Sequence, residues 1–380
     1  MATIGSDTDI EKLLDDALKP DAPVKYLETG NVGLDLALTD GKGLPLGSSI
    51  LLWADPGIGK TTVVGDLCKR LIKQYNTKKK PFKVLYLATE DSSGLLASMG
   101  LWEYKDKQDF IYIGKGLCWR QIEAIYTKIL DGKQEPWKDI KLVVIDSVGN
   151  VLSDQNLKNS SADGDYGTRN RERGAFYSKI FPRCKETGLC TILISQARQK
   201  QGAGLYEDPT KAAVSKVDLH NVDIIVKCTK ASNNTDASRI KEKTIFGTDK
   251  VTNKYIFKMD SKASSCKNRY VRGNAVELLI EKGKAVHNEY AVRKMLEGNG
   301  FMKYSGGYYS FSPELCEAFK LPDKKMRTAT ANDLIIQHMG ELIALLKKAG
   351  KYKVGISEVE IPATDDNELP FDEDTTEVEE

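Results

Sequence analysis

The chain has 380 residues, of which 41% are hydrophobic and 29% charged, a composition typical of globular proteins rather than of disordered or membrane-embedded ones. No segment approaches the roughly 18 apolar residues that a membrane-spanning helix needs, and the seven cysteines and three histidines lack the spacing of a metal site. We therefore expect reduced thiols, no structural metal, no membrane partner and a cytosolic location.

The net charge of +2 hides two oppositely charged regions. Residues 354–380 contain eleven acidic residues and no Lys or Arg, which leaves residues 1–353 at about +13. We expect an acidic disordered tail with one apolar element, NELPF. The tail either keeps the protein soluble or competes with nucleic acid for the basic body, and NELPF is also a candidate docking peptide for another protein.

The N-terminal region, residues 1–25, has no basic stretch followed by an apolar one, so we expect no secretory signal. We expect this region to be a short segment that is a candidate contact between subunits. Short apolar runs follow it, separated by segments long enough for crossover helices. They lie at 49–53, 84–88, 141–145, 190–195, 222–227 and 275–280. This order predicts an α/β core over 26–285 with a mainly parallel central sheet.

A glycine-containing loop, ADPGIGKTT at 54–62, joins the first of these runs to an amphipathic helix. Backbone N–H groups in such a turn point at an anion, which is typical of a phosphate-binding loop. We expect Lys60 to reach the β- and γ-phosphates of ATP, and Thr61 to coordinate Mg²⁺ with Thr62 behind it. Ala54 replaces the first glycine of the usual pattern. The expected nucleotide-binding residues are Asp55, Pro56, Gly57, Ile58, Gly59, Lys60, Thr61 and Thr62.

Two further apolar runs end in carboxylates. The segment LVVIDS places Asp146 at the end of a buried strand, where it can join Thr61 in holding Mg²⁺. The segment VLYLATED ends in Glu90 and Asp91, and Glu90 is the candidate general base for the attacking water. The alternatives are a turn-capping role for Asp146 and simple surface solvation for Glu90.

Five segments occur in the order and approximate spacing of the RecA family: ETGNVGLDLAL, GLPLGSSILLWADPGIGKTT, LYLATED, LVVIDSVGNVL and CTILISQARQK. Over about residues 25–285 the chain resembles these recombinases, most of all their phage UvsX-like branch. The resemblance implies a RecA-like P-loop ATPase core, ATP-dependent filament assembly on single-stranded DNA, homology search and strand exchange. It matches Lys60 and Thr61 to Walker A, Glu90 to the catalytic glutamate and Asp146 to Walker B. It also implies that Gln196 senses the γ-phosphate and relays to DNA.

Two polar segments, 160–174 and 197–216, are expected to be DNA-binding loops, because they present cations and aromatic groups where the family carries such loops. The alternative is polar loops that cover the sheet edge. The candidate DNA contacts are Tyr166, Arg169, Arg171, Arg173, Arg198, Lys200, Tyr206 and Lys211. The basic segment 257–272 matches the position of trans-acting lysines, with Lys258 and Lys262 as candidates, although a solvated strand pair explains the same charges.

Residues 286–353 read as a helix, an aromatic hairpin and a final helix, a small α+β subdomain that either contacts duplex DNA or caps the core. The expected partners are single- and double-stranded DNA, further copies in a helical filament, and a single-strand-binding protein or loading mediator. The expected location is the cytosol of a bacterium, which includes an infected host cell. The alternative functions are a hexameric DNA helicase, a RadA- or KaiC-like ATPase, and a binding protein that uses ATP only as a switch.

Overall fold

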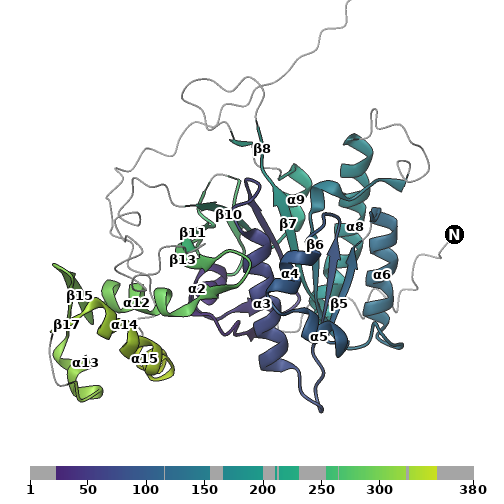
Figure 1. Ribbon diagram of the computed structural model, residues 1–380. Helices are drawn as coiled ribbons and strands as arrows, with labels where there is room; N and C mark the ends of the chain where they lie inside the picture. The colour runs from purple at the N-terminus through teal and green to yellow at the C-terminus, as the bar shows by residue number, and fades with distance from the viewer. Residues whose placement is uncertain are drawn as a thin grey trace, which may run out of the picture.

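A ten-stranded sheet forms the centre of the computed structural model (Figure 1). The structure describes residues 23–114, 116–154, 166–199, 210–211, 214–230, 254–263, 265–321 and 325–348. Six strands run parallel, in the order β10 (Ile224–Lys230), β3 (Ser49–Ala54), β7 (Cys190–Gln196), β6 (Ile140–Asp146), β4 (Lys83–Ala88) and β5 (Phe110–Gly114). The fold class expected from the sequence, an α/β core with a mainly parallel sheet, is confirmed.

The sheet continues beyond β10 with antiparallel strands. These are β11 (Lys254–Asp260), β13 (Ala275–Glu281) and β14 (Ala285–His287), while β12 (Lys267–Asn268) also pairs with β10. Strands β5 and β11 were missing from the sequence prediction. Both contain polar or exposed positions that interrupt the apolar run, because β5 lies at one edge and β11 belongs to the antiparallel part.

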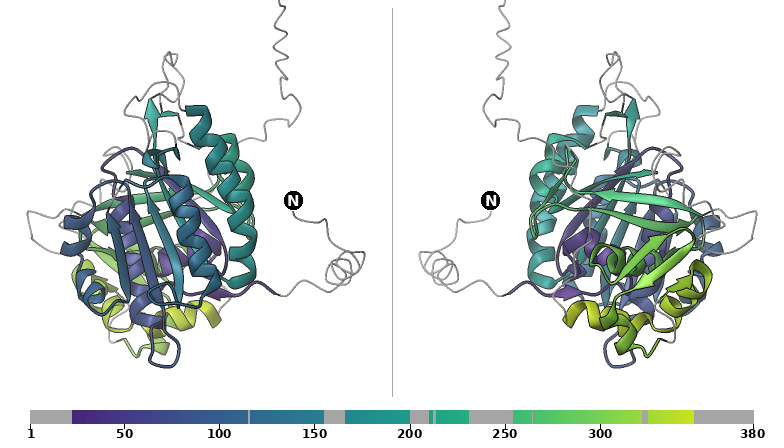
Figure 2. Two further views of the ribbon diagram at one scale, coloured as in Figure 1. Left: turned by 90° about the vertical axis from the view of Figure 1, so that its right-hand side faces the viewer. Right: turned by 90° about the vertical axis from the view of Figure 1, so that its left-hand side faces the viewer.

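Helices cover both faces of the sheet (Figures 1 and 2). Alternate residues of β3 point to opposite sides: Ile50 and Leu52 pack with α2 (Val32–Thr39) and α3 (Lys60–Tyr75), and Leu51 and Trp53 pack with α6 (Trp119–Asp131) and α8 (Tyr166–Thr187). Because both faces are buried, the parallel strands are continuous apolar runs, which explains why the sequence reveals them.

Several short elements complete the core. They are β1 (Tyr26–Leu27), β2 (Leu44–Pro45), α4 (Ser93–Ser98), α5 (Trp102–Asp106), the 3₁₀ helix η1 (Val148–Asn150), β8 (Arg198–Gln199), β9 (Thr210–Lys211) and α9 (Lys216–Asn221). Among the described residues, no helix is long and apolar enough to cross a membrane.

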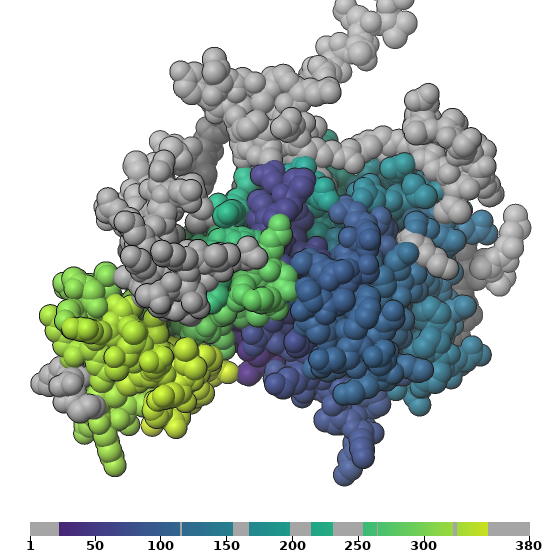
Figure 3. Space-filling model, in the orientation of Figure 1, coloured from purple at the N-terminus to yellow at the C-terminus, as the bar shows by residue number. Residues whose placement is uncertain are grey.

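The C-terminal part of the described chain is a mixed α and β lobe, the light green to yellow region at the lower left of Figure 3. It contains α12 (Asn288–Gly298), β15 (Met302–Ser305), β16 (Tyr308–Phe311), α13 (Pro313–Ala318), β17 (Lys325–Arg327), α14 (Thr328–Gln337) and α15 (Met339–Lys348). Helix α12 joins this lobe to the core, since Val292, Met295 and Leu296 pack in the same apolar cluster as α2 and β13.

The predicted loop at 160–174 is wrong for residues 166–174, which form the first turns of α8. The α8 side chains Phe176, Tyr177 and Ile180 are buried against α6 and the sheet. This packing stabilises the helix, which therefore begins earlier in the chain, among the polar residues. The segment 197–216 is likewise not a simple loop at its ends, because β8 pairs with β9. Lys200, Tyr206, residues 1–22 and the tail 354–380 lie outside the described residues.

Candidate active site

The candidate catalytic residues meet at one edge of the sheet because the strands that precede them are parallel neighbours. In the paired registers, Ala54 lies opposite Gln196, and Ala88 lies opposite Asp146. The phosphate-binding loop, Gln196, Asp146 and the segment leading to Glu90 therefore emerge side by side. Ligands bind at this carboxyl edge in open α/β sheets.

The loop between β3 and α3 depends on glycine. Gly59 has a φ of 111°, and a Cβ there would lie 2.5 Å from the Tyr255 hydroxyl oxygen, so a side chain does not fit. The same hydroxyl donates to the Ile58 carbonyl oxygen at 2.5 Å, which ties the loop to β11. A Cβ at Gly57 would meet nothing within 4 Å. The loop is thus fixed on one side and open at Gly57, as a phosphate ligand requires.

The ammonium of Lys60 lies inside this loop. The residue is 6% exposed, and its Nζ donates to the carbonyl oxygens of Ala54 and Asp55 at 2.9 Å each. Burial lowers the pKa of Lys60, against nearby negative groups that include Asp146 and Glu90. A buried cation bonded to neutral carbonyls keeps its charge available, so the loop is suited to an anion such as a triphosphate.

Asp146 is held where a metal site is expected. Its Oδ2 accepts from the Thr61 hydroxyl at 3.0 Å and from the Tyr86 hydroxyl at 2.7 Å, and the residue is 3% exposed. Burial raises the pKa of Asp146, although the bonds from Tyr86 and Thr61 oppose the shift. A bound cation would favour the ionised form. The oxygen donors of Thr61 and Asp146 fit the ligand preference of Mg²⁺.

Thr62 makes a structural contact that the sequence did not reveal. Its side chain is fully buried, and its hydroxyl oxygen accepts from the N–H of Gly283 at 3.1 Å. This bond joins the start of α3 to the turn between β13 and β14. The proposed role of Thr62 at the nucleotide therefore remains a prediction.

Glu90 contacts two amide side chains. The Nε2 of Gln196 lies 2.6 and 2.7 Å from its two carboxylate oxygens, and the Nδ2 of Asn150 donates to its Oε1 at 2.7 Å. The chain before Glu90 is anchored to the end of β6, since the N–H of Thr89 donates to the Asp146 carbonyl at 2.6 Å. Sequence reasoning predicted Glu90 and Gln196 but missed Asn150 and Tyr86. The one available signal for Asn150 was its place four residues after Asp146.

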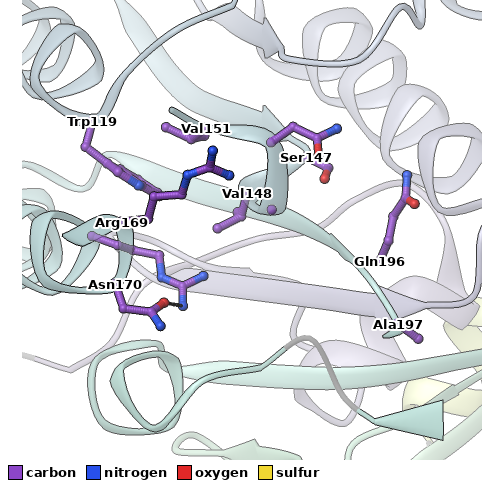
Figure 4. Close-up of a pocket in the computed structure, with 11 residues that line it drawn as sticks. Trp119, Ser147, Val148, Val151, Arg169, Asn170, Gln196 and Ala197 are labelled. Atoms are coloured by element: carbon purple, nitrogen blue, oxygen red, sulfur yellow. Dashed lines mark hydrogen bonds between the residues drawn. The ribbon is translucent and has the colours of Figure 1, made fainter. Parts of the chain in front are cut away.

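A cavity of about 140 Å³ lies beside this cluster (Figure 4). The turn after Asp146, including Ser147 and Asn150, forms one wall, while Arg169 and Asn170 of α8 form another and Gln196 completes the rim. The cavity thus adjoins both the amide groups that hold Glu90 and the predicted DNA-binding arginines.

Arg173 differs from the other predicted DNA contacts. It is 7% exposed, and its guanidinium lies 3.3 Å from the Asp218 carboxylate and donates to Ser215 and Asn170. This position inside the protein does not suit a contact with DNA. Arg169 is half-buried and Arg171 is exposed on the same helix. For Arg198, Lys211 and Tyr166 the structure describes the backbone alone.

The two trans-acting candidates make only local contacts among the described residues. Lys258, on β11, pairs with Asp260 at 3.3 Å and remains 42% exposed, while Lys262 is exposed in the bend that follows. Within the described ranges, no hydrogen bond or ion pair joins either lysine to Glu90, Lys60 or Asp146. Their proposed action on a neighbouring subunit remains a prediction.

The comparisons with known proteins agree with this geometry. A family model described as an AAA domain matches residues 39–202, which contain the loop, Glu90, Asp146 and Gln196. The chain is 24% identical over 324 residues to Protein RecA of Streptomyces avermitilis, covering 80% of this chain and 77% of the relative. It is also 24% identical over 353 residues to Protein RecA of Mycobacterium marinum, covering 92% and 88%.

A third similarity, to Protein RecA of Mycoplasma pneumoniae, covers 48% of this chain and 50% of the relative at 26% identity. At these identities the similarities support a RecA-like family and a RecA-like ATPase core. Such a core implies binding of a nucleotide, usually with Mg²⁺.

Proposed function

We propose that this protein is an ATP-dependent DNA recombinase, which forms a filament on single-stranded DNA and promotes homologous pairing and strand exchange. The observation that carries the proposal is the contact between Glu90 and Gln196. It links the candidate catalytic carboxylate directly to the strand that leads into the predicted DNA-binding segment at 197–216. The UvsX-like branch is our finer assignment within the RecA-like family.

In the proposed reaction, the loop N–H groups and Lys60 bind the phosphates of ATP. Thr61 and Asp146 would hold Mg²⁺, which neutralises phosphate charge when it is bound. Tyr86 fixes the orientation of the Asp146 carboxylate. Glu90 orients a water molecule and accepts its proton as the γ-phosphoryl group passes to the water oxygen and ADP leaves. Gln196 connects this step to DNA.

For single-stranded DNA we retain Arg169 and Arg171, which lie on the first turns of α8. Tyr166, Arg198, Lys200, Tyr206 and Lys211 complete the proposed contacts. We leave Arg173 out, since its charge is already compensated by Asp218. The contacts would be made to phosphates, because a recombinase must accept any sequence.

For duplex DNA the C-terminal lobe offers a basic face, defined here as Lys303, Tyr308, Lys325 and Arg327. Strand pairing places Lys303 and Lys325 opposite Ser310, and Arg327 opposite Tyr308, so all four side chains share one side of the small sheet. All four are exposed, and the Lys325 ammonium lies 5.1 Å from the Tyr308 ring centroid. Three cations around an aromatic ring suit a nucleic-acid backbone.

The remaining proposed partners are other copies of the chain and a single-strand-binding protein or loading mediator. In a filament, Lys258 and Lys262 would approach the ATP site of the next subunit. Both lysines are free for this role in one respect: within the described ranges, neither bonds to Glu90, Lys60 or Asp146 of its own chain.

Electron microscopy with single-stranded DNA and a slowly hydrolysed ATP analogue tests the proposed function. We expect open helical filaments that require both DNA and nucleotide. Closed rings would favour the hexameric helicase or the KaiC-like ATPase, which share the same core. If filaments form but a parallel assay detects no strand exchange, the result would favour a binding protein that uses ATP only as a switch.

A further inference from the structure

Asn150 contacts the candidate catalytic carboxylate but has no role in the proposed reaction. It ends the 3₁₀ helix that follows Asp146, and its backbone N–H donates to the Ser147 carbonyl oxygen at 3.1 Å. Its side chain extends to Glu90, where the Nδ2 to Oε1 distance is 2.7 Å. The backbone of Asn150 is therefore fixed by the turn, while its amide group is directed at the carboxylate.

The two amide groups engage both carboxylate oxygens of Glu90. An ionised carboxylate has about four lone-pair positions on its two oxygens. Oε1 accepts from Asn150, and the single Nε2 of Gln196 lies between Oε1 and Oε2, so two donors hold the group and both of its oxygens are engaged. A carboxylate held from two sides in this way is not free to turn toward a water molecule and accept its proton. The arrangement is that of a restrained base.

The two amide groups come from elements that lead toward the predicted DNA contacts. Gln196 ends β7 and lines the cavity across from Arg169 and Asn170 of α8 (Figure 4). Asn150 lines the same cavity. Both amides therefore lie beside the wall that carries Arg169, a proposed DNA contact. Asn150 is exposed, so its bond to Glu90 can open at small cost, since water takes the place of the protein partner.

From these contacts we infer that Asn150 is a second positioning residue, which together with Gln196 restrains Glu90 in the protein without DNA. This inference rests on the proposed function, because it assumes that Glu90 activates the attacking water. Asn150 would act through Glu90 and not on ATP. Binding of DNA beside the cavity would draw Asn150 away from Glu90 and free the carboxylate for hydrolysis.

Substitution Asn150→Ala tests the restraint. Without DNA, the ATP turnover number should rise roughly three- to tenfold, the range expected for removing one hydrogen bond. The KM for ATP should stay within about twofold, and the DNA-stimulated rate should be nearly unchanged. The stimulation ratio should therefore fall by the same factor as the basal rate rises.

A matched control and a second variant make the result decisive. Asn170→Ala removes the same amide from the opposite wall, where Asn170 bonds to Arg173 and, within the described ranges, makes no hydrogen bond to Glu90. This control should retain the wild-type basal rate. Asn150→Leu keeps the side-chain shape without the donor. The basal turnover of Asn150→Leu should match that of Asn150→Ala. If Asn150→Ala does not fold, Asn150→Leu alone tests the restraint.

The outcomes separate this inference from the proposed function. An unchanged or lowered basal rate in the Asn150 variants, in a protein whose turnover still depends on Glu90, would overturn the restraint alone. If Glu90→Gln itself retains normal turnover, the proposed catalytic role of Glu90 fails first, and the role of Asn150 fails with it.

Discussion

Two buried cations near the same edge of the sheet, Lys60 and Arg173, are accommodated in opposite ways. Lys60 donates to the carbonyl oxygens of its own loop, whereas Arg173 lies against the Asp218 carboxylate and bonds to Ser215 and Asn170 as well. The two residues are almost equally buried, so burial alone does not identify a functional cation. Neutral carbonyl oxygens leave the positive charge available to a ligand, whereas an ion pair neutralises the charge within the folded protein.

The largest expected effect is on ATP turnover, and it follows from the carbonyl oxygens that surround Lys60. Lys60→Ala should lower ATP turnover by about 1,000-fold and abolish ATP-induced stabilisation, because the ammonium is proposed to bind the phosphates. Its effect on the free energy of unfolding should be small, since no ion pair is broken. Steady-state kinetics and thermal melts with and without ATP measure both. Lys69→Ala, on the same helix, should leave turnover intact, and near-normal turnover in Lys60→Ala would refute the site.

The ion pair predicts the reverse pattern. Arg173→Ala should lower the free energy of unfolding by about 3 kcal/mol, because it leaves the Asp218 carboxylate buried without its cation. Arg171→Ala, an exposed change two residues away, should cost less than about 0.5 kcal/mol. Urea unfolding of both variants measures the difference. If both variants lose the same small amount of unfolding free energy, Arg173 and Asp218 are not paired. Arg173 would then again be a candidate DNA contact.

DNA binding should follow the exposed arginines. The double substitution Arg169→Ala and Arg171→Ala should weaken binding to single strands of any sequence and lower the salt slope by roughly one for each phosphate that is no longer neutralised. Titrations of labelled oligonucleotides at several salt concentrations provide the slope. If the slope does not change, the DNA lies elsewhere on the protein.

The smallest effect concerns the acidic tail. Deleting residues 354–380 should raise affinity for duplex DNA a few-fold at low salt and less at high salt, because charges are screened over about 8 Å at physiological ionic strength. Replacing Lys303, Lys325 and Arg327 by Ala should remove this gain if the tail competes for the basic face. Equal binding of the truncated and full-length chains at every salt concentration would rule out competition and leave the docking or solubility roles.

The nucleotide side of the molecule was predictable because its signals are local. A strand, a glycine turn and a helix occur within residues 49–75, and the apolar runs before Asp146 and Gln196 mark parallel strands. The start of α8 was not predictable in this way, since its glycines and arginines are typical of a loop and its buried apolar residues begin only at Phe176. The partners Tyr86, Asn150 and Asp218 depend on contacts between distant segments, which composition and spacing do not encode.

The central claim is that Glu90 catalyses hydrolysis at a site that Lys60 and Asp146 build for ATP. Turnover and nucleotide binding by Glu90→Gln, measured with and without single-stranded DNA, test it most directly. The amide keeps the size of the side chain but cannot accept the proton of water, so ATP should still bind and DNA complexes with ATP should persist, while turnover falls by about 100-fold or more. Wild-type turnover in Glu90→Gln, with normal DNA stimulation, would contradict the account.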